Sequence, residues 1–401
     1  FRMILKYGLK VFPRLVKYKL AMWGLARPPH PLFFNFSITN KCQSKCTMCN
    51  IWKLYKEFPE KEKKELNLHE IEKVFKTMDP VFQLSICGGE PFLREDLDKI
   101  CVLACKHLKP TVIHTPTNCL SPEKVEKLTL SIMRRIPKDV KFTIKLSLDG
   151  IGEKHDKIRG VEGNFDKLVD TYKRLAKIRV LHPNLYLDAG VTVSMSNLGD
   201  IKEITEYVEK EFRLDNFLHE IADTRAELFN VDTDKELQDE FEGVMGDLHV
   251  TPTGNDYEKV IGLLLDDVRE QMKVNRKFSR FVQALRLVYY KRAEKVMVGG
   301  KRVVPCYAGI SNSHLNPWGG MWLCNVQAFQ KEMGNVRDFA FDFDKLWHSE
   351  RANEMRKFVK SNQCHCPLVG QSFLDTVLSP KELTKVFYYY FFGAGNGKSS
   401  N

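Results

Sequence analysis

Short apolar runs alternate with stretches of helical period along the first 234 residues of the chain. The runs are rich in β-branched and aromatic residues and predict strands at 33–39, 81–87, 111–116, 142–148, 185–194 and 216–222. Between them, apolar residues recur at helical spacing over 68–78, 95–108, 122–134, 164–180 and 199–212. Strands that alternate with helices predict parallel βα units. Six units are too few to close an eight-stranded barrel, so we expect an α/β fold with a partial (βα)6 TIM-type barrel.

The rest of the chain predicts smaller regions around this barrel. Residues 235–300 predict helices of mixed charge in a linker region, with a break at 251–254. A short hairpin is expected between Val303 and Val326, turning in the Pro- and Gly-rich segment 316–320, and a helix follows at about 343–360. The expected regions are N-terminal helices at 1–32, the barrel at 33–234, the linker at 235–300, a small α+β domain at 301–370, and a C-terminal helix with a disordered tail at 371–401.

The net charge of +11 is concentrated at the start of the chain. The first 40 residues contain no acidic residue and seven basic ones, namely Arg2, Lys6, Lys10, Arg14, Lys17, Lys19 and Arg27. Apolar residues are spaced among them with a broadly helical period interrupted at Pro13, and an aromatic patch lies at 387–392. Both segments suit a membrane interface, through residues 1–30 above all, but equally suit helices packed over the bottom of the barrel. A nucleic acid is the least favoured partner, because this arm is more apolar than a typical phosphate-binding arm.

Eleven cysteines favour metal or redox chemistry in a reducing compartment, so we expect a cytoplasmic protein, with a peripheral place on the cytoplasmic membrane face left open. Cys42, Cys46 and Cys49 follow the first predicted strand at C-x3-C-x2-C spacing. Three thiolates can share one 4Fe–4S cluster but leave one iron without a protein ligand, as catalytic metal sites do. Taken alone, the same three cysteines suit a zinc knuckle or a set of buried thiols equally well. Four others (Cys87, Cys101, Cys105 and Cys119) are expected to be packing residues.

Further motifs follow the next predicted strands. Gly88-Gly89-Glu90-Pro91 ends the second strand, Thr117-Asn118-Cys119 the third, and Ser147-Leu148-Asp149-Gly150 the fourth, with His155-Asp156 and Arg159-Gly160 close behind. Alone, the Glu90 segment would suit a strand-to-helix turn with a capping glutamate. Together with the cysteine loop, these motifs resemble the radical S-adenosylmethionine (SAM) superfamily over about residues 33–225. One departure is Met48, where the family usually has an aromatic residue.

The resemblance implies an enzyme in which SAM binds the open iron of the cluster. It implies SAM contacts from Met48 and from Gly88 to Pro91, with Glu90 paired to the SAM ammonium. Asn118, Ser147 and Asp149 would face the SAM ribose and carboxylate, or the substrate. An electron from a flavodoxin- or ferredoxin-type donor would cleave SAM, and the resulting 5′-deoxyadenosyl radical would abstract a substrate hydrogen.

A second group of cysteines follows the linker. Cys306 and Cys324 bracket the expected hairpin, and Cys364 and Cys366 follow the last predicted helix of that domain. This part resembles the SPASM and twitch domains that many radical SAM enzymes carry, although a full SPASM domain has seven cysteines. Four thiolates suit one fully ligated auxiliary 4Fe–4S cluster, and a four-cysteine zinc site is the alternative.

We therefore expect radical oxidation, cross-linking or epimerisation of a peptide or of a lipid or isoprenoid substrate. His219, Glu220, Asp223 and Arg225, at the end of the sixth strand, are the candidates for substrate contact, and a salt-bridged rim is the other interpretation. The alternative from another class is a non-catalytic iron–sulfur or zinc protein that transfers electrons or acts as a scaffold. The SAM-type motif at Gly88–Pro91 argues against it, because a simple carrier needs no such motif.

Overall fold

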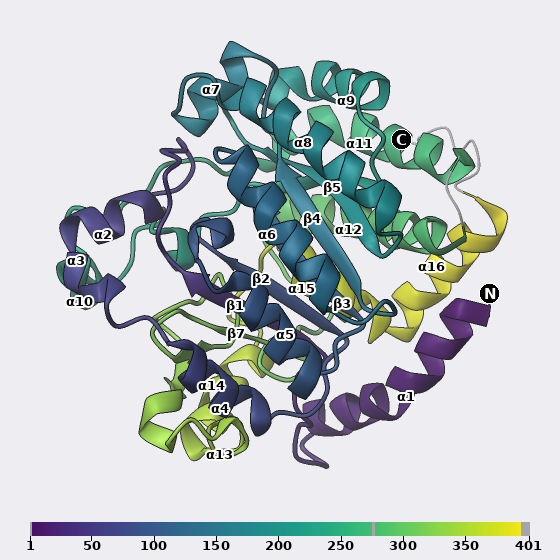
Figure 1. The fold of residues 1–401 in the computed structure, drawn as a ribbon. Helices are drawn as coiled ribbons and strands as arrows, with labels where there is room; N and C mark the ends of the chain where they lie inside the picture. The colour runs from purple at the N-terminus through teal and green to yellow at the C-terminus, as the bar shows by residue number, and fades with distance from the viewer. Residues whose placement is uncertain (1, 275–276, 394–401) are drawn as a thin grey trace.

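A computed structural model describes residues 2–274 and 277–393, with their side chains except at 2–10, 274 and 277–279. All its strands join one nine-stranded sheet in the order β6-β5-β4-β3-β2-β1-β7-β8-β9 (Figure 1). The first seven strands in this order pair in parallel, and β7, β8 and β9 pair antiparallel. The sheet is open, with β6 and β9 at its two edges, as expected for a partial barrel.

The strands are β1 (Phe33–Thr39), β2 (Gln83–Gly88), β3 (Val112–Thr117), β4 (Lys141–Ser147), β5 (Leu185–Val193), β6 (Asn216–Ile221), β7 (Asn312–Leu315), β8 (Gly320–Trp322) and β9 (Glu332–Asn335). The helices are α1 (Arg2–Met22), α2 (Leu54–Glu57), α3 (Pro59–Glu62), α4 (Leu68–Lys76), α5 (Leu97–His107), α6 (Pro122–Arg135), α7 (Glu153–Arg159), α8 (Asn164–Leu181), α9 (Ile201–Glu211), α10 (Lys235–Glu240), α11 (Gly254–Val274), α12 (Lys277–Gly299), α13 (Phe343–Trp347), α14 (Glu350–Lys360), α15 (Val369–Val377) and α16 (Pro380–Phe392). All six predicted barrel strands and the five helices between them are confirmed.

Alternation along each strand sorts its side chains onto two faces. In β1, Phe34, Phe36 and Ile38 are fully buried in the main core. Successive strand residues point to opposite faces, so Asn35 and Ser37 lie on the other side. The core side is covered by helices, with α5, α6 and α8 lying over the sheet in Figure 1. The other side, called the inner face below, is where the candidate site lies.

Helices α11 and α12 extend the helical layer instead of linking two domains. They pack on each other, and α12 packs on α15 and α16. Burial of Tyr257, Leu264, Tyr289 and Tyr290 in the main core explains this arrangement, because an amphipathic helix pair gains stability by covering apolar surface.

The C-terminal region is part of the barrel sheet. The expected hairpin forms between β7 and β8, but β7 also pairs in parallel with β1, from Phe33↔Asn312 to Phe36↔Leu315. The helix expected at about 343–360 is two helices, α13 and α14, because the Ser349 side chain accepts a hydrogen bond from Ala352 N and starts α14 anew.

Two expectations about the chain ends were wrong, and a third is untested. Helix α1 is continuous through Pro13, and two helices, α15 and α16, replace the one expected C-terminal helix. The predicted disordered tail at 394–401 lies outside the described residues. Among the described helices, none is both long and apolar enough to cross a membrane.

Candidate functional site

The loop after β1 gathers the first three cysteines at one end of the sheet. Cys42, Cys46 and Cys49 are free thiols, and burial raises the pKa of each, that of Cys42 to about 12. The neighbouring sulfurs raise the pKa values of Cys42 and Cys49 further, because two thiolates side by side repel each other. Three half-buried thiols that disfavour one another's ionisation fit a shared metal cluster, since a cation at their centre removes that repulsion.

A buried ion pair stands directly against this loop. Arg159 Nη1 donates to Asp149 Oδ2 at 3.0 Å, and Asp149 Oδ1 accepts from Thr192 N at 2.8 Å. Burial opposes the charge on Arg159, but Cys46 and Asp149 raise its pKa. The end of α7 also pairs with the loop, because Lys45 N donates to Arg159 O at 3.0 Å. Arg159 therefore places a positive charge beside the three thiols, whereas the Asp149 carboxylate is occupied in holding Arg159.

The Gly-Gly-Glu-Pro segment is attached to the start of the same loop. A Cβ on Gly88, whose φ is +121°, would lie 2.1 Å from Thr39 O, and one on Gly89 would lie 2.2 Å from Lys41 O. Gly89 N donates to Thr39 O at 2.8 Å. The two glycines are needed for this close backbone approach, which fixes the cysteine loop on the end of β2.

Glu90 is buried and its carboxylate is occupied by backbone groups. Its Oε1 accepts from Phe92 N at 3.1 Å and its Oε2 from Asn118 N at 2.6 Å. Burial raises the pKa of Glu90 to about 7, and these donors lower it. These contacts favour the capping interpretation of Glu90, because both carboxylate oxygens accept hydrogen bonds from backbone N–H groups.

Asn118 connects this carboxylate to the cysteine loop. Its Nδ2 lies 3.8 Å from Cys42 Sγ and 3.3 Å from Gln43 Oε1. Met48 is buried in a small apolar cluster beside Cys46 and Cys49, and Ser147 ends β4 on the inner face. Pro91 starts the short 3-10 helix after the glycines. Apart from Ser147, the predicted SAM-contact residues thus lie in or beside this one loop, either directly or through a neighbour.

The second group of cysteines also converges. Cys306, Cys324, Cys364 and Cys366 line a single cavity together with two arginines and Asp375. Arg302 Nη2 donates to Cys364 Sγ at 2.9 Å. Burial raises the pKa of Cys306, Cys324 and Cys366. Four thiols and positive charge around one cavity fit an anionic four-thiolate centre, whether iron–sulfur or zinc.

The inner face between the two groups is mostly polar. The polar side chains that alternate with core residues along β1 to β6 include Asn35, Ser37, Ser85, Cys87, His114, Lys145, Ser147, Asp188, Thr192, Asn216 and Glu220, and the same face also carries the apolar or aromatic residues Phe33, Val112, Pro116, Tyr186 and Leu218. Lys145 Nζ forms an ion pair with Glu220 Oε1 at 2.6 Å. Burial, with a smaller contribution from Lys145, lowers the pKa of His114 to about 4. A substrate on this face meets charges and hydrogen-bonding groups together with a smaller number of apolar side chains.

Sequence reasoning missed Lys145 and His114. The signal was present, because each is an ionisable residue inside an otherwise apolar strand segment, FTIKLSL and TVIHTP.

Three of the four substrate-contact candidates lie near the inner face, but the prediction for His219 was wrong. His219 is 2% exposed and points to the helical side, where Thr205 and Arg286 contact its ring nitrogens. Its neighbour Glu220 takes the inner face, because adjacent strand residues point in opposite directions. Burial raises the pKa of Asp223 to about 6, and Arg225 lies between the carboxylates of Asp223 and Glu227.

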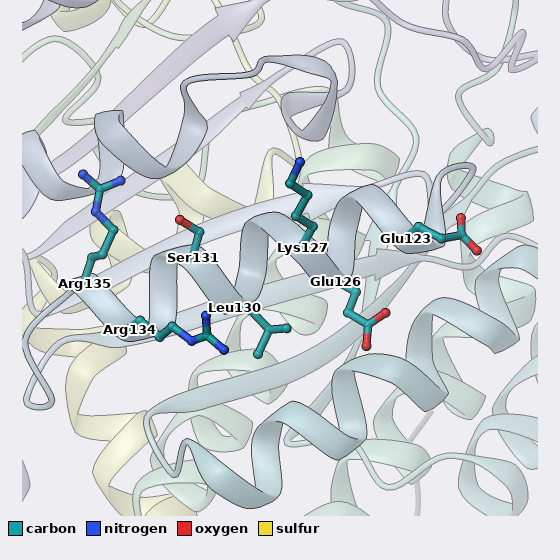
Figure 2. Close-up of a pocket in the computed structure, with 7 residues that line it drawn as sticks. All are labelled: Glu123, Glu126, Lys127, Leu130, Ser131, Arg134 and Arg135. Atoms are coloured by element: carbon teal, nitrogen blue, oxygen red, sulfur yellow. The ribbon is translucent and has the colours of Figure 1, made fainter.

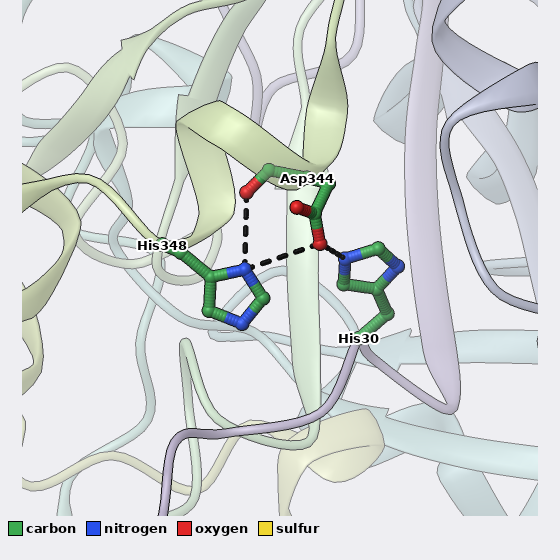
Figure 3. A group of neighbouring side chains, drawn as sticks. All are labelled: His30, Asp344 and His348. Carbon is green, nitrogen blue, oxygen red and sulfur yellow. Dashed lines mark hydrogen bonds and ion pairs between the residues drawn. The ribbon is translucent and has the colours of Figure 1, made fainter.

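Two other groups of polar side chains have structural explanations. The hollow on the outer surface of α6 (Figure 2) lies away from both cysteine groups. Its Glu126 and Glu123 pair with Arg174 of α8. In the cluster of His30, Asp344 and His348 (Figure 3), His30 Nδ1 accepts from Asp79 N at 2.9 Å, so its Nε2–H faces Asp344. Neither ring nitrogen of His30 then has a free lone pair for a metal ion. The cluster instead ties His30 to α13.

Residues 36–208 match the Radical SAM superfamily. A curated relative is the Bacillus subtilis (strain 168) antilisterial bacteriocin subtilosin biosynthesis protein AlbA, 21% identical over 378 residues, which cover 91% of this chain and 71% of AlbA. Another is the Fe-coproporphyrin III synthase of Methanosarcina barkeri (strain Fusaro / DSM 804), 29% identical over 44% of this chain and 40% of the relative.

Among solved structures, Streptococcus suis SuiB bound to S-adenosylmethionine matches with a TM-score of 0.53 at 14% identity, over 88% of this chain and 72% of SuiB. SuiB bound to the precursor peptide SuiA matches with a TM-score of 0.50 at 15% identity, over 88% and 71%. These likenesses show the same partial-barrel fold.

The chain therefore carries a radical SAM domain, and it is an enzyme that uses SAM and a 4Fe–4S cluster. The resemblance drawn from the cysteine loop and the glycine motif is confirmed.

Proposed function

We propose that this enzyme modifies a peptide by radical abstraction of a hydrogen atom. The observation that carries the proposal is the mostly polar inner face, which carries the Lys145–Glu220 ion pair. A peptide has amide groups and charges to satisfy there, whereas an isoprenoid chain would leave those groups desolvated without partners. The match to AlbA over 91% of this chain supports a peptide as well, since AlbA acts in bacteriocin biosynthesis.

The synthase match does not favour a porphyrin over a peptide. It spans 44% of this chain, a share close to that of the radical SAM domain alone. Functions that share this domain differ in what the rest of the chain binds.

In the proposed reaction, Cys42, Cys46 and Cys49 hold the cluster, and Arg159 balances its negative charge. The bound cluster and SAM together supply the 5′-deoxyadenosyl radical. Gly88 and Gly89 keep the cysteine loop in place. The Lys145–Glu220 pair orients the peptide, and the buried barrel end excludes water.

We also propose that Cys306, Cys324, Cys364 and Cys366 hold one auxiliary 4Fe–4S cluster that accepts or relays an electron. The site lies beside the predicted substrate position, because the carboxylate of Asp223, a substrate-contact candidate after β6, acts electrostatically on Cys366. A flavodoxin- or ferredoxin-type protein is the proposed electron donor.

A peripheral membrane contact is proposed at the N-terminal helix. Phe12, Trp23 and Leu25 are more than 60% exposed, and Lys17 is exposed beside them. Phe12 and Lys17 lie on α1, and Trp23 and Leu25 lie in the turn that follows it; exposed aromatic and basic side chains close together suit a headgroup region. Flotation with anionic vesicles tests this contact: the intact protein should float and a Trp23→Glu/Leu25→Glu variant should not, and equal flotation would refute it.

The substrate class is tested by isotope transfer. Cells that lack the gene are grown in deuterated medium, and their peptide and lipid fractions are incubated separately with the reconstituted enzyme, dithionite and unlabelled SAM. We expect deuterium in 5′-deoxyadenosine with the peptide fraction alone, and none with a Cys46→Ala variant. Label from the lipid fraction alone would refute a peptide substrate, and no 5′-deoxyadenosine at all would refute the radical chemistry.

A further inference from the structure

Three side chains of metal-binding type meet at the inner face, outside both cysteine groups. Cys87 ends β2, Glu227 lies in the short 3-10 helix after β6, and His314 lies in β7. One donor atom from each, sulfur, carboxylate oxygen and imidazole nitrogen, lies within 4.8 Å of the other two. The three come from distant parts of the sequence, so only the fold brings them together.

Glu227 is a buried carboxylate that lacks a close partner. It is 8% exposed, and among the described residues no group donates a hydrogen bond to it. Its two nearest charged or ring nitrogens are Arg225 Nη1 at 3.8 Å and His314 Nε2 at 3.6 Å. Holding an ionised carboxylate in a mostly buried position without a close hydrogen bond is unfavourable. A cation that contacts Glu227 directly would remove this cost.

His314 is oriented as a ligand. Its Nδ1 lies 2.9 Å from Asn325 Oδ1, and an amide oxygen only accepts, so Nδ1 carries the proton. The lone pair is therefore on Nε2, which faces Glu227 and the Ser37 hydroxyl at 2.7 Å. An outer hydrogen bond that fixes the tautomer in this way is the usual support of a metal-bound histidine. Two acceptors, Nε2 and the carboxylate, thus face each other across 3.6 Å.

Cys87 completes the set and gives it access to the inner face. Its side chain is half-buried and alternates with the core residue Ile86. Ser37 Oγ lies 3.6 Å from Cys87 Sγ, so the hydroxyl that now bonds His314 can turn to the sulfur when a metal takes the nitrogen. The separation of 3.6 Å between nitrogen and carboxylate oxygen is close to the roughly 3.4 Å between tetrahedral ligands at zinc bond lengths.

We propose that Cys87, Glu227 and His314 bind one zinc ion. Three protein ligands of nitrogen, oxygen and sulfur type leave a fourth position open, as in catalytic zinc sites and unlike structural ones. The open position faces the inner face, where a substrate carbonyl or thiolate can bind. Zinc binding displaces the thiol proton of Cys87, and no electron transfer is involved. Binding of the substrate at this zinc rests on the proposed function, but the metal site itself does not, because its ligands belong to neither cluster.

Zinc analysis of the complete enzyme tests the site. The full-length protein is reconstituted with iron and sulfide, so that both cluster sites are filled, then equilibrated with zinc and desalted. We expect about one zinc per chain by mass spectrometry, and a zinc absorption-edge spectrum with about one sulfur and otherwise nitrogen and oxygen neighbours. Cys87→Ser and Glu227→Gln should each lose most of the zinc, whereas Cys105→Ala, which removes another half-buried thiol, should retain it.

A second variant reports on the outer hydrogen bond. Asn325→Ala leaves all three ligands in place but frees the His314 ring, so zinc affinity should fall about 10- to 100-fold. Zinc that persists in Cys87→Ser, a spectrum with four sulfur neighbours, or no zinc in the cluster-loaded protein would each overturn the proposal. Formation of 5′-deoxyadenosine by the same sample is read separately, so failure of the radical chemistry is distinguishable from failure of the zinc site.

Discussion

Replacing Asp149 by asparagine removes one charge from an ion pair that is shielded from solvent. The side chains of Asp149 and Arg159 are 1% and 11% exposed, and their contact is 3.0 Å long. Asparagine keeps an oxygen for Thr192 N but leaves the guanidinium without its carboxylate. Breaking a buried pair from one side costs about 3–5 kcal/mol, because the remaining charge stays buried.

The corresponding change in melting temperature follows from chain length. Unfolding entropy near the midpoint is about 2.1 cal/mol/K per residue, or roughly 0.84 kcal/mol/K for 401 residues. A loss of about 4 kcal/mol therefore lowers Tm by about 5 °C. In the cluster-loaded protein the loss should be smaller, since Cys42 and Cys46 still offer Arg159 negative charge.

Thermal unfolding followed by circular dichroism without oxygen measures this shift. Glu153→Gln is the matched control, because that carboxylate is 92% exposed and its change should move Tm by less than about 1 °C. The double variant Asp149→Asn/Arg159→Met should be more stable than the sum of the single changes by about 2 kcal/mol. A shift under about 1 °C for Asp149→Asn, or strict additivity in the double variant, would refute the reasoning.

Three other changes have defined outcomes. Gly88→Ala should abolish cluster assembly, because the new Cβ would lie 2.1 Å from Thr39 O. Gly199→Ala, where a Cβ meets open space, should leave the iron content unchanged, and equal iron in both variants would contradict this prediction. Lys145→Met should move the acid limb of the pH–rate profile to higher pH, because Lys145 opposes the effect of burial and lowers the pKa of Glu220. An acid limb at the same pH would argue against a catalytic role for the Lys145–Glu220 pair. Cys306→Ser should reduce iron from about eight to about four atoms per chain with the SAM-cluster spectrum retained, and an unchanged iron count would contradict the auxiliary cluster.

The barrel and the first cysteine site could be predicted from local sequence. Each strand and helix of the βα units has a pattern within its own residues, and the glycines at 88 and 89 stand next to the loop they contact. Side-chain direction was predictable too, but needed the alternation to be followed residue by residue. His219 and Glu220 are neighbours, and so cannot both face the inner side.

The contacts of β7 could not be predicted in the same way. Its four residues, Asn312–Leu315, are mostly polar and fully buried, and their partner β1 lies some 280 residues earlier. Nothing in residues 312–315 identifies such a pairing, since the stabilising contacts come from β1, whose position these residues do not reveal. His314, Glu227 and Cys87 were missed as a group for the same reason.

Because β7 is hydrogen-bonded to β1, the C-terminal region cannot swing away without breaking the central sheet. The path between the two cysteine groups is therefore of fixed length, and under the proposed auxiliary-cluster role an electron would cross the same gap in every catalytic cycle. The same pairing limits protein engineering. Removing the residues after 300 would uncover the β1 edge at Phe33–Phe36, a bare parallel strand open to association with other chains. A C-terminal region transplanted from another enzyme must therefore supply a strand that pairs with β1 at this edge.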